Sequence, residues 1–305
     1  MTDESMDSRG TRADQMFRPR RRFLTEALGL GAGAAGLAAV GGGEALGQMG
    51  GPRVDDAAIV NFALNLEYLE AEYYTYATTG MGLEAAGVRV DGSGTLGAVT
   101  VKMNPTVPFA TDIIRQYAFE IADDERRHVV FERAALAALG VQPVARPPID
   151  LLNSFHALGN LIGVPDFDPF ANETNFLLGA YVFEDVGVTA YHGAARLLRN
   201  KDILEAAAGI LAVEAYHAGE IRTVLYARGQ GAATEAISGV RRSLSTKNDD
   251  YGVGPVNGQS RIVLADANAV AFSRNYRQVL NIVYGAVGAP RGLFFPRGMN
   301  GVLTN

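Results

Sequence analysis

Two Glu-x-x-His tetrads, Glu125–His128 and Glu214–His217, constrain this 305-residue chain more than any other feature. Each tetrad lies in a strongly helical stretch. Each also follows an apolar helical stretch that carries one more glutamate, Glu67 in the first case and Glu184 in the second. Residues at i and i+3 share a helix face, so the Glu and His of a tetrad can bind one ion together. Two such half-sites are the ligand set of a two-metal carboxylate centre inside a four-helix bundle.

The spacing is specific, and its surroundings are apolar. With 16 glutamates in the chain, two Glu-x-x-His tetrads among four histidines would arise by chance about 2% of the time. If the apolar faces point inward, four carboxylates share a dry core, where each uncompensated charge costs several kcal/mol. Two divalent cations would balance these charges. The alternative is that each tetrad is an exposed ion pair on a solvated helix face, since Asp123–Arg127 is a run of charges.

The composition narrows the choice of metal and partner. The chain has no cysteine, which excludes disulfides, thiolate metal sites and cysteine nucleophiles. Glu, Asp and His ligands suit two Fe or two Mn ions, with Zn as a further option. The net charge is −6, and Lys and Arg form no long run outside the N-terminal segment, so nothing indicates binding to nucleic acid.

The first helix offers more than one candidate ligand. Glu67 and Glu70 share a face, whereas Glu72 points elsewhere. We favour Glu67 because Tyr74 follows it by seven residues, just as Tyr191 follows the glutamate of the second half by seven. Seven residues are nearly two turns, so each tyrosine is predicted to lie in line with its own glutamate. Glu70 is kept as an alternative or supporting ligand, and both tyrosines could instead be plain core aromatics.

Three further side chains bear on the site. Asp124 is predicted to accept the free ring N–H of His217, and the position before the second tetrad is a valine, so this support would be one-sided. Glu132 is four residues beyond the first tetrad and can face the same interior, with a surface ion pair as the alternative. His156 lies in the crossover and His192 is off the face of the site, so both are predicted to be structural.

The chain is predicted to be all-α. A hairpin-like insertion is expected at 80–107, around an Asp-Gly turn, and a long crossover at 140–172 includes a short helix at 151–161. An extension, 229–305, is expected to contain a fifth helix at 268–284 and an apolar tail that packs back on the bundle. The four bundle helices are predicted at 54–78, 108–139, 173–198 and 202–227.

The N-terminal segment has the features of an export signal. Arg20–Leu24 reads Arg-Arg-Arg-Phe-Leu and precedes an apolar run, Leu28–Val40, which is too short to span a bilayer. Ala45–Gly47 is a small-x-small cleavage site, so residues 1–47 resemble a twin-arginine signal peptide. The expected partner is then the twin-arginine export machinery, and the expected location is the periplasm or the cell exterior. A plain N-terminal tail and an uncleaved anchor are the alternatives.

Residues 54–228 resemble the ferritin-like superfamily through the four glutamates and two histidines. Three segments are closer to one branch, the ferritin-like desiccation-related proteins: Asn61–Tyr73, Val182–Tyr191 and Phe294–Gly301. The resemblance implies a ferritin-like four-helix bundle, spanning 48–228, with a di-iron or di-manganese centre. Two departures are the long connection between the first two helices and the C-terminal extension. The extension argues against a 24-subunit cage and leaves smaller homo-oligomers open.

Three functions fit these features. The leading hypothesis is an exported di-metal carboxylate protein whose partner is a small-molecule oxidant, peroxide or dioxygen. It would act like a catalase, peroxidase or ferroxidase in oxidative stress or desiccation, which makes it a candidate oxidoreductase. The alternative is a non-catalytic stress-protection protein with a structural or vestigial metal site. An oxygenase acting on an organic substrate is the third, and it would need an apolar pocket beside the metals.

Overall fold

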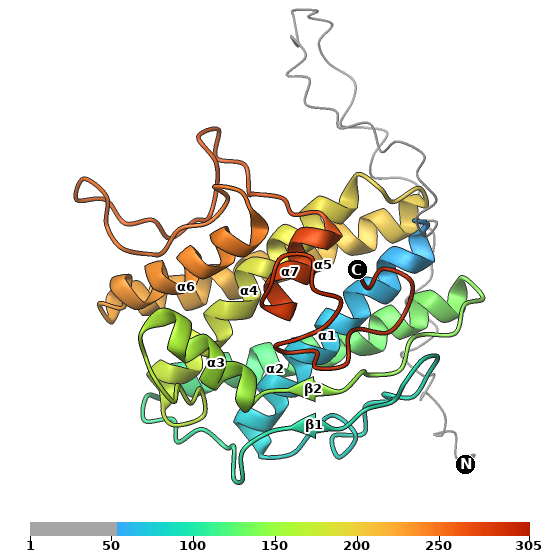
Figure 1. The fold of residues 1–305 in the computed structure, drawn as a ribbon, viewed down its shortest axis with the longest axis horizontal. Helices are drawn as coiled ribbons and strands as arrows, with labels where there is room; N and C mark the ends of the chain where they lie inside the picture. Colours follow the sequence, from blue (N-terminus) through green and yellow to red (C-terminus); the bar gives the residue numbers. More distant parts are fainter. Residues whose placement is uncertain (1–53) are drawn as a thin grey trace, which may run out of the picture. The chain divides into compact units, whose positions relative to one another are not determined.

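The computed structural model describes residues 54–305, so the predicted export signal lies outside the described range. Four long helices form the bundle (Figure 1): α1 (Asp56–Thr79), α2 (Asp112–Ala138), α4 (Glu173–Ala195) and α5 (Lys201–Ala227). Helix α1 packs along α2 and α4 packs along α5, and the two pairs meet through α1 and α4. The predicted all-α four-helix bundle is therefore confirmed. Among the described residues, no helix has both the length and the apolar character needed to cross a membrane.

Polar side chains set the ends of these helices. The Asp55 carboxylate accepts a hydrogen bond from Ala58 N at 2.9 Å and begins α1, which ends at Gly80 in the left-handed region (φ 76°). Helix α2 begins four residues later than the sequence suggested. The Glu173 carboxylate accepts from the backbone N–H groups of Ala110 and Thr111, at 3.0 and 2.8 Å, and so holds that segment outside the helix.

Helices α1 and α4 are buried on almost every face. The α2–α5 side of the bundle covers one flank, while α6, α7 and the C-terminal tail contact the other. A helix buried all round lacks a polar stripe, which explains why these two helices read as apolar runs without clear amphipathic periodicity. The site residues that they carry consequently lie far from solvent.

The predicted hairpin at 80–107 is wrong. Strand β1 (Val99–Thr100) pairs in parallel with β2 (Ile149–Asp150) in the crossover, which also contains α3 (Asn153–Ile162). The glycines that suggested turns serve a different purpose. A Cβ on Gly97 would lie 2.2 Å from Pro148 N, and one on Gly92 would lie 2.2 Å from Pro143 O. These positions need glycine because the insertion and the crossover run against each other.

The C-terminal extension contains two helices rather than one, α6 (Gly231–Ser245) and α7 (Tyr276–Tyr284). Helix α7 begins eight residues later than predicted, because Asn275 and Gln278 form a capping box there. Helix α6 escaped prediction because its buried face is mostly polar. The buried positions follow helical spacing and are Thr234, Ile237, Ser238, Arg241 and Ser245.

A buried ionic network joins the extension to the bundle. Asp185 of α4 binds both Arg222 of α5 and Arg241 of α6, each through its Oδ2 at 2.8 Å. Arg241 and Arg274 in turn both bind Asp250, at 2.8 Å. All five side chains are at most 2% exposed, so each charge depends on its partners rather than on water.

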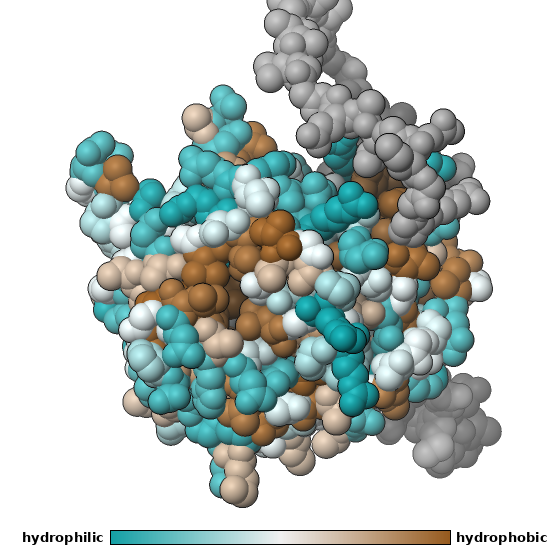
Figure 2. Space-filling view, viewed as in Figure 1, coloured by the Kyte–Doolittle hydropathy of each residue, from teal (hydrophilic) through white to brown (hydrophobic). Residues whose placement is uncertain are grey.

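The C-terminal tail packs back on the bundle. Phe294 lies edge-on to Phe155 and Phe183, with ring centroids 5.2 and 5.0 Å apart. Asn300 and Asn65 of α1 exchange two hydrogen bonds of 3.0 Å between side chain and backbone. On the face drawn in Figure 2, apolar residues gather in the middle, over the region of α3, α6 and α7, and hydrophilic residues surround them.

Candidate metal centre

The six predicted ligands converge in the middle of the bundle. One comes from α1, one from α4 and two each from α2 and α5, and none is more than 8% exposed. The i and i+3 members of each tetrad face inward from one side of their helix, as the spacing requires. The ligands are Glu67, Glu125, His128, Glu184, Glu214 and His217.

The two histidines mark two halves of one cluster. His128 Nδ1 lies 3.3 Å from Glu67 Oε2, 3.5 Å from Glu125 Oε1 and 3.6 Å from Glu214 Oε1. His217 Nδ1 lies 3.2 Å from Glu125 Oε1 and 3.4 Å from Glu184 Oε2. Each ring nitrogen therefore faces carboxylate oxygens from several helices, and Glu125 belongs to both halves.

The donor atoms fit metal ions. Three sets of donors lie within 4.8 Å of one another: Glu67, Glu125, His128 and Glu214; Glu125, Glu184 and His217; and Glu70, Glu184 and Glu214. Within residues 54–305, both oxygens of Glu125 and of Glu214 lack a hydrogen-bond partner, as do Nδ1 of both histidines. Unpartnered buried donors cost free energy, and shared cations would satisfy them together. Their role as ligands stays a prediction that metal analysis tests.

Each of the two tyrosines binds the glutamate on the other helix of the α1–α4 pair. Tyr74 donates to Glu184 Oε1, and Tyr191 donates to Glu67 Oε1. Seven residues separate each tyrosine from the glutamate of its own helix by about 10 Å along the axis, which is too far for a hydrogen bond between them. Helices α1 and α4 run antiparallel, which places each tyrosine beside the glutamate of the other helix.

The remaining acidic candidates divide into two groups. Glu70 and Glu132 are buried beside the centre, and each has one oxygen without a hydrogen-bond partner among the described residues. Glu132 Oε1 lies 2.9 Å from the same Tyr191 hydroxyl, whose single proton is shared between the carboxyl groups of Glu67 and Glu132. Glu72 points away, as predicted, and forms a buried ion pair with Arg146 of the crossover.

Neither His156 nor His192 joins the cluster. His156 is half-buried in α3, and His192 Nδ1 lies 3.2 Å from Phe272 O. The structure therefore supports the sequence-based separation of two site histidines from two structural ones.

Burial raises the pKa of five carboxyl groups at the centre. It raises the pKa of Glu67 to about 7, where nearby Glu125 adds to the shift and His128 opposes it. Burial and neighbouring carboxylates also raise the pKa values of Glu70, Glu132, Glu184 and Glu214. Removing a carboxylate from water disfavours its charged form, so protons replace the missing positive charge in metal-free protein.

Charge pairing dominates at the remaining groups. Burial alone would lower the pKa of His128, but the carboxylates of Glu67 and Glu125 outweigh it and raise the pKa to about 12. Burial would raise the pKa of Glu125, but the two histidines outweigh it and lower the pKa. Burial, reinforced by nearby carboxylates, raises the pKa values of Tyr74 and Tyr191, so both phenols keep the protons that they donate.

The stability of metal-free protein should fall as the pH rises from 5 to 8. The folded pKa of Glu67, about 7, exceeds its ordinary value of 4.5, so the folded state holds a proton that the unfolded state releases. His128 acts in the same direction. Its protonated ring stabilises the folded state fully below pH 6.5, its ordinary pKa, and this stabilisation is lost as the pH rises toward its folded pKa of about 12. Since 1 kcal/mol shifts the melting temperature by about 2–4 °C, a fall of about 5 °C or more is expected.

Circular dichroism melts in the presence of a chelator measure this fall. Metal binding requires deprotonated carboxyls, so the melting temperatures of metal-loaded and metal-free protein should diverge as the pH rises. A metal-free melting temperature that stays constant or rises over this range would contradict the assignment.

Asp124 supports only one half of the centre. Its Oδ2 lies 3.4 Å from His217 Nε2, and the hydrogen bond from His217 lowers the pKa of Asp124 despite partial burial. Asp124→Asn should weaken binding of the ion held by His217 about 10–100-fold, because such partners fix the orientation of a ligand ring. The ion held by His128 should be unaffected. Equal weakening of both ions, in a titration that resolves the two sites, would show that Asp124 does not act through His217.

Comparisons with known proteins agree with this architecture. Residues 55–227 match the model of the ferritin-like domain. The chain is 32% identical over 273 residues to the desiccation-related protein PCC13-62 of Craterostigma plantagineum, covering 81% of this chain and 83% of that protein. It is 30% identical over 279 residues to the ferritin-like catalase Nec2 of Nesocodon mauritianus, covering 81% and 85%. With these matches spanning the bundle and its centre, the chain belongs to the ferritin-like domain family.

Proposed function

We propose that the buried cluster binds two Fe or two Mn ions and that the loaded protein breaks down peroxide. The observation that carries this proposal is the pair of overlapping donor sets that share Glu125 in the bundle core. The similarity to a protein named ferritin-like catalase supports peroxide as the substrate.

The donor sets suggest how the ions are held. Glu67, Glu125, His128 and Glu214 would hold one ion, and Glu125, Glu184 and His217 would hold the other. Two divalent cations carry four positive charges, which match the four carboxylates of these sets. Burial raises the pKa values of the two additional carboxyls, Glu70 and Glu132, so both can stay neutral.

The protein's own groups prepare the site. The bound pair would supply the two-electron redox chemistry needed to convert two H₂O₂ into two H₂O and one O₂. Tyr74 and Tyr191 hold one oxygen of Glu184 and one of Glu67, which leaves the second oxygen of each free for an ion. Glu70 faces Glu184 and Glu214 and can hold a proton at Oε2 beside the carboxylates of the cluster. Burial of the whole cluster excludes bulk water.

The test is elemental analysis of the purified protein, followed by oxygen release from H₂O₂ on the same sample. About two redox-active ions per chain and turnover that a chelator abolishes are expected. Glu70→Gln should retain both ions and lose turnover, whereas Glu67→Gln should lose one of the two ions. Protein that holds two ions and releases no oxygen would refute the catalase-like activity but not the metal centre.

A non-catalytic protective role is the second candidate, favoured by the similarity to a desiccation-related protein. It predicts that protection of a dried reporter enzyme persists in Glu125→Gln protein. The peroxide proposal predicts that any protection disappears together with the metal.

A further inference from the structure

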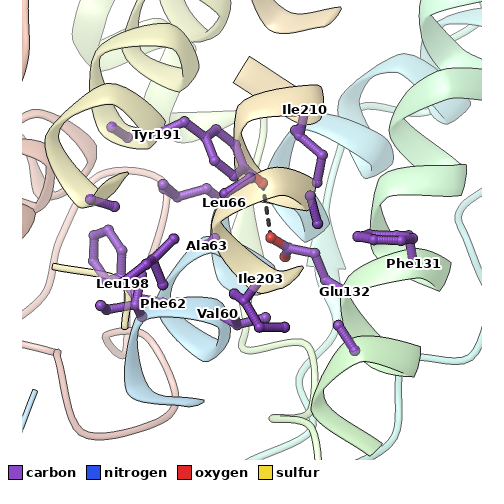
Figure 3. Close-up of a pocket in the computed structure, with 16 residues that line it drawn as sticks. Val60, Phe62, Ala63, Leu66, Phe131, Glu132, Tyr191, Leu198, Ile203 and Ile210 are labelled. Atoms are coloured by element: carbon purple, nitrogen blue, oxygen red, sulfur yellow. Dashed lines mark hydrogen bonds between the residues drawn. The ribbon is translucent and has the colours of Figure 1, made fainter. Parts of the chain in front are cut away.

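An apolar pocket opens at the end of the bundle where α1 begins and α4 ends (Figure 3). Its interior has a volume of about 40 Å³, and all four bundle helices contribute to its wall. Such a narrow space suits a slender ligand rather than a bulky one. Val60, Phe62, Phe131, Ile203 and Ile210 form much of the wall.

Two polar side chains stand in this otherwise apolar lining. Among the described residues that line the pocket, only Glu132 and Tyr191 carry polar side-chain atoms. Glu132 is 3% exposed, and its Oε1 is hydrogen-bonded to the Tyr191 hydroxyl at 2.9 Å, as the dashed line in Figure 3 shows. Its Oε2 is buried with no hydrogen-bond partner among residues 54–305. A buried oxygen without a partner is unfavourable, so the pocket lacks one polar group that a ligand can supply.

The opposite end of the centre shows that such a pocket is not inherent to the bundle. Two pairs of positions correspond in the two halves of the bundle. Tyr73 directly precedes Tyr74, and Ala190 directly precedes Tyr191. Phe176 lies eight residues before Glu184, and Ile59 lies eight residues before Glu67. The Tyr73 and Phe176 rings stack with centroids 5.7 Å apart and fill that end. At the pocket end, the smaller side chains of Ala190 and Ile59 occupy the corresponding positions.

The same comparison of the two halves shows that Glu132 has no acidic counterpart. It lies seven residues after Glu125, and the residue seven after Glu214 is Ile221, which is buried. One half of the bundle therefore has an ordinary core residue where the other has a buried acid facing an apolar pocket. Packing alone does not require a carboxyl group there, because burial of an unpaired polar group is unfavourable.

We propose that this pocket binds a slender organic molecule with an alkyl body and one terminal hydroxyl group. The alkyl chain would lie against the apolar wall, and the hydroxyl would meet Glu132 Oε2. A hydroxyl both donates and accepts, so it satisfies this oxygen whether the acid is ionised or protonated. Tyr191 links the base of the pocket to Glu67, which places the ligand one side chain from the candidate metal centre.

The test is calorimetric titration of the full-length, metal-loaded protein with 1-octanol and with octyl methyl ether, which lacks the O–H group. Binding of 1-octanol with a Kd below about 1 mM, at least 10-fold tighter than the ether, is expected. Glu132→Leu should abolish the preference for the alcohol. Equal affinity for both probes in the unmodified protein would overturn the proposal.

A matched pair of variants on α5 tests the location. Ala207→Phe narrows the pocket and should weaken binding of 1-octanol at least 10-fold, whereas Ala208→Phe at the adjacent exposed position should not. Equal binding by the two variants would place the probe elsewhere. If 1-octanol binds only after residues 1–47 are removed, or only when a dimer dissociates in sedimentation, the natural occupant of the pocket is a segment of this chain or a second copy of it. Either result would overturn the proposal. Peroxide turnover is measured separately, so its failure leaves this inference intact.

Discussion

Replacing Glu125 by glutamine should abolish binding of both metal ions, whereas Glu67→Gln and Glu184→Gln should each remove one. Glu125 is 0% exposed and belongs to both donor sets that contain a histidine, while Glu67 and Glu184 each belong to one of these two sets. An amide is a weak ligand for these ions and supplies no charge to balance them. Inductively coupled plasma analysis after dialysis should therefore show a fall from about two ions per chain to fewer than about 0.5 for Glu125→Gln.

The same variant should lower the stability of metal-loaded protein far more than that of metal-free protein. An ion that binds only the folded state at 100 times its dissociation constant stabilises it by about 2.7 kcal/mol, and Glu125→Gln forfeits this for both ions. In metal-free protein, the substitution removes one buried charge from a cluster rich in carboxyls, although it also removes a partner of His128 and His217. The loss of stability should therefore be much smaller without metal. Equal losses with and without metal would contradict a metal role for Glu125.

Replacing Arg241 by methionine should cost about 3–5 kcal/mol in the free energy of unfolding, because the charges of Asp185 and Asp250 would remain buried without this partner. Arg241 Nη2 lies 2.8 Å from Asp185 and 2.9 Å from Asp250, and the side chain is 2% exposed. Methionine keeps much of the volume, so the expected loss comes from charge rather than from a cavity. Urea unfolding followed by circular dichroism measures it.

Arg242→Met is the matched control on the same helix. Arg242 pairs with Glu235, whose side chain is 43% exposed, and also donates to the backbone carbonyl of Asp250 at 2.6 Å, so it leaves no buried charge without a partner when it is replaced. The control should cost about 1–2 kcal/mol. A similar cost for both variants would mean that the buried network does not hold the extension on the bundle.

Capping signals within a few residues explain where most of the helices begin and end. Asp55, Gly80 and Asn200 stop or start helices through their own backbone or side-chain bonds, which sequence reveals. The errors occurred where a distant segment decides. The Glu173 carboxylate delays the start of α2, and the crossover pairs with 80–107 to replace the expected hairpin. Helix α6 was missed because Arg241 is buried there only by virtue of Asp185 and Asp250.

The candidate centre follows the same division. The i, i+3 spacing of Glu125 and His128, repeated at Glu214 and His217, sufficed to predict which helix faces meet, because helical geometry alone fixes that spacing. The distances of 3.2–3.6 Å from each histidine to carboxylates on other helices come from the packing of four helices. The partners of Tyr74 and Tyr191 likewise depend on the antiparallel run of α1 and α4, which no local pattern encodes.

By itself, the sequence determined the helical repeat, the donor set and the one-sided position of Asp124, since these depend on spacing along a single helix. Only the tertiary structure decided which glutamate each tyrosine holds, how Arg241 joins the extension to the bundle and where the pocket beside Glu132 opens. The pocket exists because Ala190 and Ile59 leave space that Tyr73 and Phe176 fill at the opposite end. Such differences appear only when side chains from separate helices are brought into contact, because packing depends on volumes summed across elements.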